Sequence, residues 1–250
     1  MTFVFNLGRI VYMLRPFFFF YGGKWRIAKK YPTPKHDTII EPFAGSAAYS
    51  VRYPEKKVIL YDADPVVFGV WDYLIHVSEE EILNLPNGFD SVDDLSVPQE
   101  AKWLIGFLLN KGCTRPCKTP CAWMRDPRYS YQFWGPKIQN RIAAQIPRIR
   151  HWKIYNEDFQ KVENRKATWF IDPPYSDKGK HYKINNIDYP VLGEWCRGRE
   201  GQTIVCENDG ANWLPFETLC EARSLREKSI GRSKEAMWYR EDECLLDLSI

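Results

Sequence analysis

In the segment ATWFIDPPYSDKG, residues 167–179, an apolar run ends in one carboxylate, two prolines and an aromatic ring. The large apolar residues before Asp172 are typical of a buried strand. Pro173 and Pro174 lack an amide hydrogen and fix φ at roughly −65°, so the turn that they form is stiff. Each proline also pushes the residue before it out of the helical region. Asp172 and Tyr175 are therefore expected in nearly fixed relative positions, which is typical of a functional site.

The rest of the chain alternates between β-branched apolar runs and stretches with helical periodicity. The predicted strands lie within 37–46, 56–65, 151–159, 167–175 and 201–209, with closing strands at 236–240 and 244–250. The predicted helices lie within 47–54, 66–77, 100–110 and 136–146. This alternation predicts an α/β fold with a doubly wound, mostly parallel, Rossmann-like sheet.

Polar segments follow several of the predicted strands. They are Glu41–Ser46, Asp62, Asp158 and Asp172–Tyr175. Because ligands of such sheets bind beyond the carboxyl ends of the strands, we expect these segments to share one edge. A glycine turn at Gly45 lets the backbone approach a ligand closely, and a carboxylate in the position of Asp62 accepts ribose hydroxyls in nucleotide-binding sheets.

The composition is that of a folded chain. The 250 residues are 44% hydrophobic and 15% aromatic, which argues against disorder and allows one domain with an insertion or two small domains. The apolar stretch RPFFFFYGG, residues 15–23, is too short to span a bilayer. It is predicted to form a buried strand or an apolar staple.

Charge is distributed unevenly, although the formal net charge is only +3. Seven acidic residues and no Lys or Arg occur between Glu79 and Glu100, whereas Lys111 to Lys153 holds ten basic residues and one acidic residue. Aromatic residues are interleaved with these basic residues. Such a mixture suits a phosphate backbone and unstacked bases, and its alternative interpretation is a solvated surface with ordinary core aromatics.

The seven cysteines are an odd number, and no signal peptide precedes them. We therefore expect reduced thiols and a cytoplasmic protein, in a bacterial cell or a phage-infected host. Cys113, Cys117 and Cys121 are spaced loosely for zinc, with no histidine nearby to complete four ligands, so no metal site is predicted.

Five motifs in this order resemble the DNA adenine methyltransferase family. They are FYGGKWR (20–26), EPFAGSAAYS (41–50), YDADP (61–65), NEDF (156–159) and DPPY (172–175). The similarity covers roughly residues 14–75 and 150–245. It implies an enzyme that transfers a methyl group from S-adenosylmethionine to the exocyclic N6 amino group of adenine.

The resemblance implies a role for each matching residue. DPPY supplies the catalytic residues Asp172, Pro173, Pro174 and Tyr175, with Tyr175 stacking on the base. The implied cofactor-binding residues are Phe20, Gly23, Lys24, Glu41, Phe43, Gly45, Ser46, Asp62, Asp158, Phe159 and Asp172. One departure is Ala47, which stands where the family usually has a second glycine.

The DPPY segment also has a chemical interpretation. The amino nitrogen of adenine is a poor nucleophile because its lone pair is delocalised into the ring. Hydrogen bonds to Asp172 and to the carbonyl of Pro173 would favour a tetrahedral nitrogen and stabilise the charge that develops during attack. The rigid prolines place these acceptors in advance. Because the amino group is inaccessible within a duplex, the base must be flipped out or single-stranded.

The resemblance divides the chain into a catalytic domain, residues 1–76 and 151–250, and an inserted DNA-recognition region, residues 77–150. This inserted region contains the basic and aromatic segment up to Arg150. The predicted DNA contacts are Arg115, Lys118, Arg125 and Arg128.

Three alternatives stay open at the sequence level. The same fold and cofactor would serve cytosine-N4 or adenine in RNA, and an inactive relative would bind nucleic acid without catalysis. The expected partners are DNA and a cognate restriction endonuclease, with no membrane. A NAD-dependent dehydrogenase is disfavoured because the first loop lacks the G-x-G-x-x-G spacing.

Overall fold

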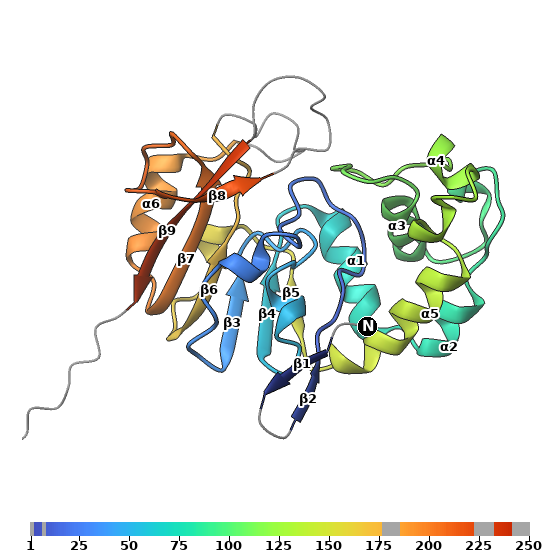
Figure 1. The fold of residues 1–250 in the computed structure, drawn as a ribbon, viewed down its shortest axis with the longest axis horizontal. Coiled ribbons are helices and arrows are strands. Elements are labelled where there is room, and N and C mark those ends of the chain that lie inside the picture. Colours follow the sequence, from blue (N-terminus) through green and yellow to red (C-terminus); the bar gives the residue numbers. More distant parts are fainter. Residues whose placement is uncertain (1–2, 7–8, 177–185, 223–232, 242–250) are drawn as a thin grey trace, which may run out of the picture.

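The computed structural model describes residues 3–6, 9–176, 186–222 and 233–241. The described part is a mixed α/β fold in which one large sheet lies beside a group of helices (Figure 1). The predicted closing strand at 244–250 lies outside the described residues. No described helix is both long enough and apolar enough to cross a membrane.

The main sheet has seven strands in the described part of the chain, in the order β5-β4-β3-β6-β7-β9-β8. The strands are β3 (Thr38–Glu41), β4 (Lys57–Tyr61), β5 (Lys153–Tyr155), β6 (Ala167–Ile171), β7 (Gly201–Asn208), β8 (Glu217–Ala222) and β9 (Ser233–Glu241). Pairing is parallel from β5 to β7, whereas β9 runs antiparallel to both of its neighbours. Counted within the sheet, the order is 3-2-1-4-5-7-6, which is the dinucleotide-binding order 3-2-1-4-5-6 with one antiparallel strand inserted.

The central strands are buried on both faces, and alternate residues enter two separate hydrophobic cores. Ile39 and Phe170 face the core that contains helix α1 (Pro65–His76), while Ile40 and Trp169 face the core that contains helix α6 (Tyr189–Arg197). The mostly parallel Rossmann-like sheet is therefore as expected, apart from the antiparallel strand β9.

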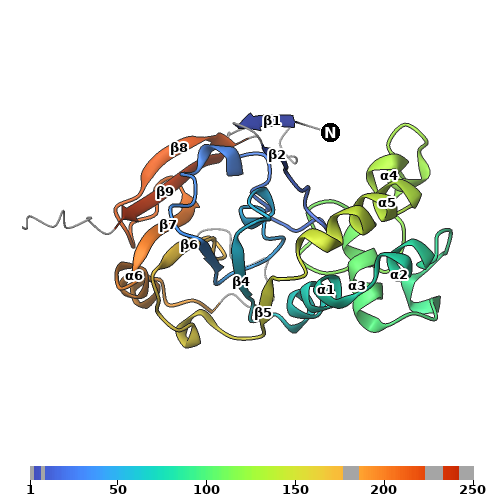
Figure 2. The same ribbon diagram turned by 90° about the horizontal axis from the view of Figure 1, so that it is seen from below.

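Residues 77–150, which we call the helical region, form helices and contribute no strand to the sheet. The α-helices are α2 (Glu79–Asn84), α3 (Gln99–Leu108), α4 (Ala122–Arg125) and α5 (Pro136–Gln145), and the 3-10 turns are η3 (Val92–Asp94), η4 (Ser130–Gln132) and η5 (Ile146–Arg148). Figures 1 and 2 show this group beyond the β5 edge of the sheet, next to α1 and at the opposite end of the molecule from α6.

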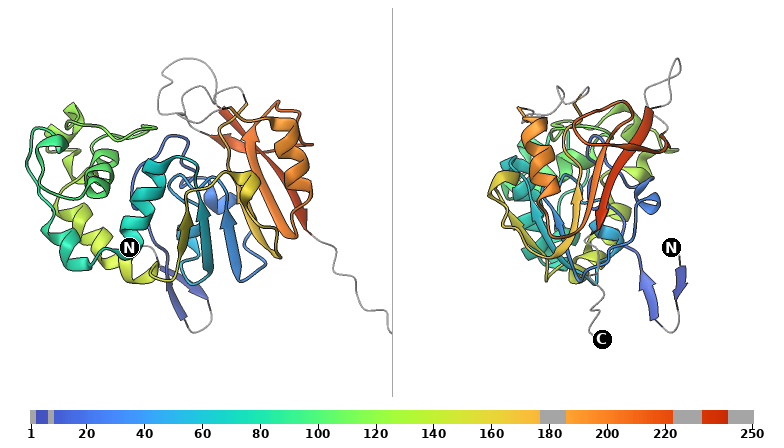
Figure 3. Two further views of the ribbon diagram at one scale, coloured as in Figure 1. Left: turned by 180° about the vertical axis from the view of Figure 1, so that it is seen from behind. Right: turned by 90° about the vertical axis from the view of Figure 1, so that its left-hand side faces the viewer.

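Two N-terminal features complete the fold. Strands β1 (Phe3–Asn6) and β2 (Arg9–Tyr12) form a hairpin that projects from the body of the molecule (Figure 3). Residues 15–23 form no strand, and Phe17 and Phe18 are both buried. Their rings pack on Trp71 with centroid distances of 5.7 and 5.6 Å, so the segment acts as an apolar staple.

The helix predicted within 47–54 is wrong. Only the short turn η2 (Ser50–Arg52) forms there, and two further turns elsewhere are η1 (Ala28–Lys30) and η6 (Phe159–Lys161). Ala47, the first residue of the segment, has a φ of +45° in the left-handed region, so a right-handed helix cannot include it.

Candidate active site

One cleft at the carboxyl ends of β3, β4 and β6 contains all eleven residues that the sequence predicted to bind a cofactor. The empty space along its lining, open solvent included, is about 950 Å³. The lining comes from segments far apart in the sequence: the loop before Lys24, the turn after β3, the ends of β4 and β6, and η6. Of the predicted catalytic residues, Asp172 and Pro174 line the cleft.

The turn after β3 forms the floor of the cleft. Gly45 has a φ of +45°, and a side chain on it would meet the Phe20 ring at 3.1 Å. Its carbonyl accepts a hydrogen bond from Trp71 Nε1 at 2.8 Å. Ala47 is fully buried in the core and does not line the cleft, so its methyl group points away from the ligand space.

Glu41, at the end of β3, is the most deeply buried acid of the cleft. Its side chain is 2% exposed and accepts a hydrogen bond from Ser50 N at 2.8 Å. Burial raises the pKa of Glu41 to about 8, and the hydrogen bonds from Ser50 only partly offset that effect. Glu41 is therefore mostly protonated at neutral pH and would release its proton to solvent when a cationic group binds beside it.

Asp62 joins two loops of the cleft. Its Oδ2 accepts from Gly45 N at 3.0 Å, and its Oδ1 accepts from Asp64 N at 2.9 Å. Burial raises the pKa of Asp62 to about 6, against the lowering effect of these two amides. Asp64 in turn caps α1 by accepting from Val66 N at 3.0 Å.

One wall of the cleft is aromatic and is formed by Phe43 and Phe159. Phe159 is buried, and its ring lies 5.6 Å from that of Phe43, centroid to centroid. Asp158 caps η6 by accepting from Gln160 N at 3.0 Å, which fixes the carboxylate beside this wall. Two rings next to a carboxylate can hold a flat heterocycle that carries an amino group.

Asp172 follows β6 and pairs with Lys24 Nζ at 3.0 Å. Its side chain keeps 20% of its surface exposed, whereas that of Lys24 is only 7% exposed. Removal from water raises the pKa of Asp172 to about 6; Lys24 opposes this shift, and Glu235 and Glu207 add to it. The carboxylate is therefore ionised at pH 7.5 and can accept a hydrogen bond.

The remainder of the DPPY segment is held by side-chain contacts. The carbonyl of Pro174 accepts from the Tyr189 hydroxyl at 2.7 Å. Tyr175 packs inward: its hydroxyl donates to Glu235, and Lys24 Nζ lies 4.5 Å from the centre of its ring. Glu235 belongs to β9. Its place beside the DPPY segment was not predicted from the sequence, because a glutamate in a closing strand normally faces solvent.

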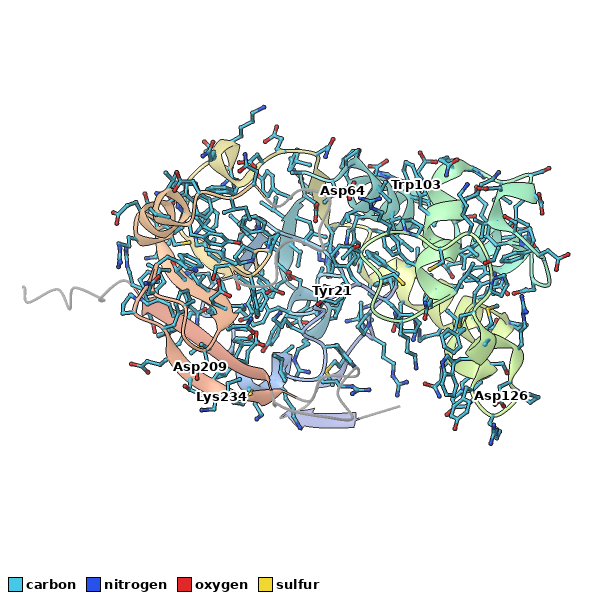
Figure 4. All side chains as sticks on the ribbon, turned by 90° about the horizontal axis from the view of Figure 1, so that it is seen from above. Tyr21, Asp64, Trp103, Asp126, Asp209 and Lys234 are labelled. Atoms are coloured by element: carbon cyan, nitrogen blue, oxygen red, sulfur yellow. The ribbon has the colours of Figure 1, made fainter. Side chains whose placement is uncertain are left out.

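The four predicted DNA contacts are exposed residues of the helical region. Lys118 pairs with Asp93 at 2.6 Å, and Arg128 pairs with Asp126 at 2.7 Å. Arg115 and Arg125 have no ion pair with any described residue. Figure 4 shows Asp126 at the outer end of the helical region, whereas the cleft residue Tyr21 lies near the centre of the molecule.

The aromatic residues of the basic segment divide into two groups. Phe133, Trp134 and Trp152 are core residues. Trp123, Tyr131 and Tyr129 are 59%, 52% and 36% exposed. Arg128 lies 5.4 Å from the Tyr129 ring and Lys137 lies 4.6 Å from the Tyr131 ring. We call these five residues the α4 patch: Trp123, Arg128, Tyr129, Tyr131 and Lys137.

The segment that contains Cys113, Cys117 and Cys121, which we call the cysteine segment, contacts the loop of the cleft through its backbone. Tyr21 N donates to Cys113 O at 3.1 Å, and the neighbouring Thr114 lines the cleft. The Sγ atoms of Cys113 and Cys117 lie 3.5 Å apart. Within the described ranges, no group of three or more His, Cys, Asp or Glu side chains is arranged to hold a metal ion.

Comparison with known proteins adds little. No family model and no curated protein matches the chain. A solved structure of a conserved hypothetical protein from Streptococcus pyogenes is 10% identical over 82% of this chain and 86% of that one, with a TM-score of 0.32. A likeness of this degree carries no argument about function.

Proposed function

We propose that this chain is an S-adenosylmethionine-dependent methyltransferase that acts on the N6 amino group of adenine in DNA. The observation that carries the proposal is the cleft. Eleven residues selected from sequence motifs alone line a single cavity at the switch in strand order between β3 and β6. Ligands of open α/β sheets bind at such a switch point.

The lining suits S-adenosylmethionine. The ring pair Phe43 and Phe159 would take the adenine ring, and Asp158 its amino group. Asp62 would accept ribose hydroxyls with the lone pairs that its two backbone bonds leave open, and Glu41 would face the cationic part. When bound, the cofactor supplies an activated methyl group on a sulfonium.

The described residues account for the remaining chemistry. Ionised Asp172 would accept a hydrogen bond from the amino group of the target base and hold its nitrogen in line. Lys24 contacts Asp172 Oδ1 and keeps the carboxylate in place at the cleft edge. The stiff Pro173–Pro174 pair limits reorganisation during transfer.

The α4 patch supports nucleic acid as the substrate. Its exposed rings offer stacking surfaces and its cations offer phosphate contacts, which together suit unstacked bases on a strand. DNA rather than RNA follows from the resemblance of the motifs.

The test is methyl transfer from labelled S-adenosylmethionine to unmethylated DNA, followed by digestion to nucleosides. We expect label in N6-methyl-2′-deoxyadenosine for the wild type and a loss of at least about a hundredfold in Asp172→Asn, which keeps the shape but removes the charge. Asp209→Asn is the matched control, because Asp209 follows β7 at the same edge of the sheet and lies outside the cleft.

Each other outcome contradicts part of the proposal. Label in N4-methyl-2′-deoxycytidine would keep the mechanism and change the base. Label only with RNA would change the substrate class. Cofactor binding by calorimetry without transfer to any nucleic acid would leave a binding protein.

A further inference from the structure

Glu235 is a buried carboxylate to which the proposed mechanism gives no role. It lies on β9 opposite Asn208 of β7, at the carboxyl end of the parallel strands. The residue is 4% exposed. A carboxylate this deep is costly unless hydrogen bonds and a cation satisfy it.

Three donors from separate segments converge on one oxygen of this carboxylate. Tyr31 donates its hydroxyl to Oε1 at 3.0 Å, and the Tyr175 hydroxyl donates to the same atom. Lys24 Nζ lies 3.6 Å from Oε1. Glu235 therefore links three segments of the chain: the loop that holds Lys24, the segment that holds Tyr31, and the DPPY turn that holds Tyr175.

Two of these donors, Lys24 and Tyr175, also interact with Asp172, the catalytic carboxylate. Lys24 is shared, because its Nζ lies 3.0 Å from Asp172 Oδ1 and 3.6 Å from Glu235 Oε1. The same ammonium lies over the Tyr175 ring at 4.5 Å. Lys24 Nζ also donates to the carbonyl of Gly22 at 2.9 Å, so Glu235 is one of at least three groups that hold this ammonium, and neutralising it changes the field at Asp172.

We infer that Glu235 is a positioning residue for Asp172: it anchors the Lys24 ammonium and the Tyr175 hydroxyl, which together fix the place and the charge of the catalytic carboxylate. The inference rests on the proposed function only where its test measures the rate of methyl transfer. The groups that face Asp172 from the surrounding elements are one cation, three acids, two phenols and a thiol: Lys24, Glu41, Glu207, Glu235, Tyr31, Tyr175 and Cys206.

The decisive measurement is the titration of the Asp172 carboxyl by NMR with ¹³C-labelled aspartate, assigned by its absence in Asp172→Asn. In Glu235→Gln a negative charge near Asp172 disappears, while Lys24 Nζ keeps its contacts with Asp172 Oδ1 and with the carbonyl of Gly22, so the midpoint should fall by about one pH unit. The acid limb of the methyl-transfer rate should move with it. We also expect kcat to fall by about tenfold because Lys24 and Tyr175 lose their anchor.

Glu235→Asp separates charge from position. It keeps the negative charge and shortens the side chain, so kcat should fall while the Asp172 midpoint stays within about 0.3 units of the wild type. Glu241→Gln is the matched control, because Glu241 lies on the same strand, is exposed and pairs only with Lys35 among the described cations. It should leave both readouts unchanged.

A folded Glu235→Gln protein with an unchanged midpoint and unchanged kcat would overturn the inference. If that variant does not fold, an Asp variant with wild-type kcat overturns it instead. A wild type that transfers no methyl group, combined with a shifted midpoint in Glu235→Gln, would refute the proposed function and keep the assignment of Glu235.

Discussion

At the scale of single residues, Ala47 has a backbone conformation that favours glycine. Its φ of +45° costs a residue with a Cβ about 1 kcal/mol. The methyl group is accommodated because it enters the core rather than the cleft. The departure from the motif is therefore a matter of stability, and the ligand space is untouched.

Glu41 gives a prediction about pH. Its pKa is raised from 4.5 to about 8, so the folded state holds a proton that the unfolded state releases between these values. The stability contributed by this group is complete below about pH 4.5 and is lost as pH rises through 8. Glu41→Gln should therefore be more stable than the wild type at pH 8, by on the order of 3 kcal/mol, with little difference at pH 4.5.

Urea unfolding of both proteins at the two pH values measures this difference. The exposed Glu163→Gln serves as the control and should follow the wild type at each pH. A constant difference between Glu41→Gln and the wild type would show that the change in packing, not the proton, sets their stability.

At the scale of elements, the contact of α3 with the cysteine segment shapes the cleft from a distance. A side chain on Gly106 would meet Cys117 O and Pro116 Cβ, each at 2.7 Å. Cys117 N donates to Gly106 O at 3.1 Å, so the two backbones are fixed against each other. The same segment carries Thr114, which lines the cleft.

Gly106→Ala is therefore expected to push the segment outward. Overpacking of this kind costs about 1–3 kcal/mol, and we expect weaker S-adenosylmethionine binding although the mutated residue lies outside the cleft. Thermal unfolding and calorimetry measure the two effects. Gly198→Ala is the control, because its added Cβ would have only ordinary contacts of 3.6 Å or more. Equal affinity in Gly106→Ala and the wild type would mean that the segment does not shape the cleft.

At the scale of the whole molecule, the strands of the sheet and the lining of the cleft could be predicted from the sequence. The segment after β3 and the long-range contacts between side chains could not. The runs around Ile39, Ile59 and Phe170 are apolar, short and end in polar turns, so local patterning sufficed for β3, β4 and β6. The sign of φ at Ala47 is not visible in a pattern of hydrophobicity, and the predicted helix failed there. The burial of Glu235 depends on a contact 204 residues away in the chain, with Tyr31, which local patterning cannot supply.

The separation of the α4 patch from the cleft leads to the last prediction. Because the patch lies at the outer end of the helical region and the cleft near the centre of the molecule, one nucleic acid strand must extend over both to gain both sets of contacts (Figure 4). Trp123→Ala combined with Tyr131→Ala should weaken binding of a long single strand by about 2–4 kcal/mol, since base stacking on an aromatic ring is worth about 1–3 kcal/mol per base.

The same double variant should leave S-adenosylmethionine affinity and binding of a trinucleotide unchanged, because neither ligand reaches the patch. Lys137→Gln should instead reduce the salt dependence of long-strand binding by about one phosphate contact. Tyr239→Ala, which removes a similarly exposed ring from β9, is the control. If long and short strands lose affinity equally in the double variant, the patch acts on the fold of the helical region and not as a platform for bases.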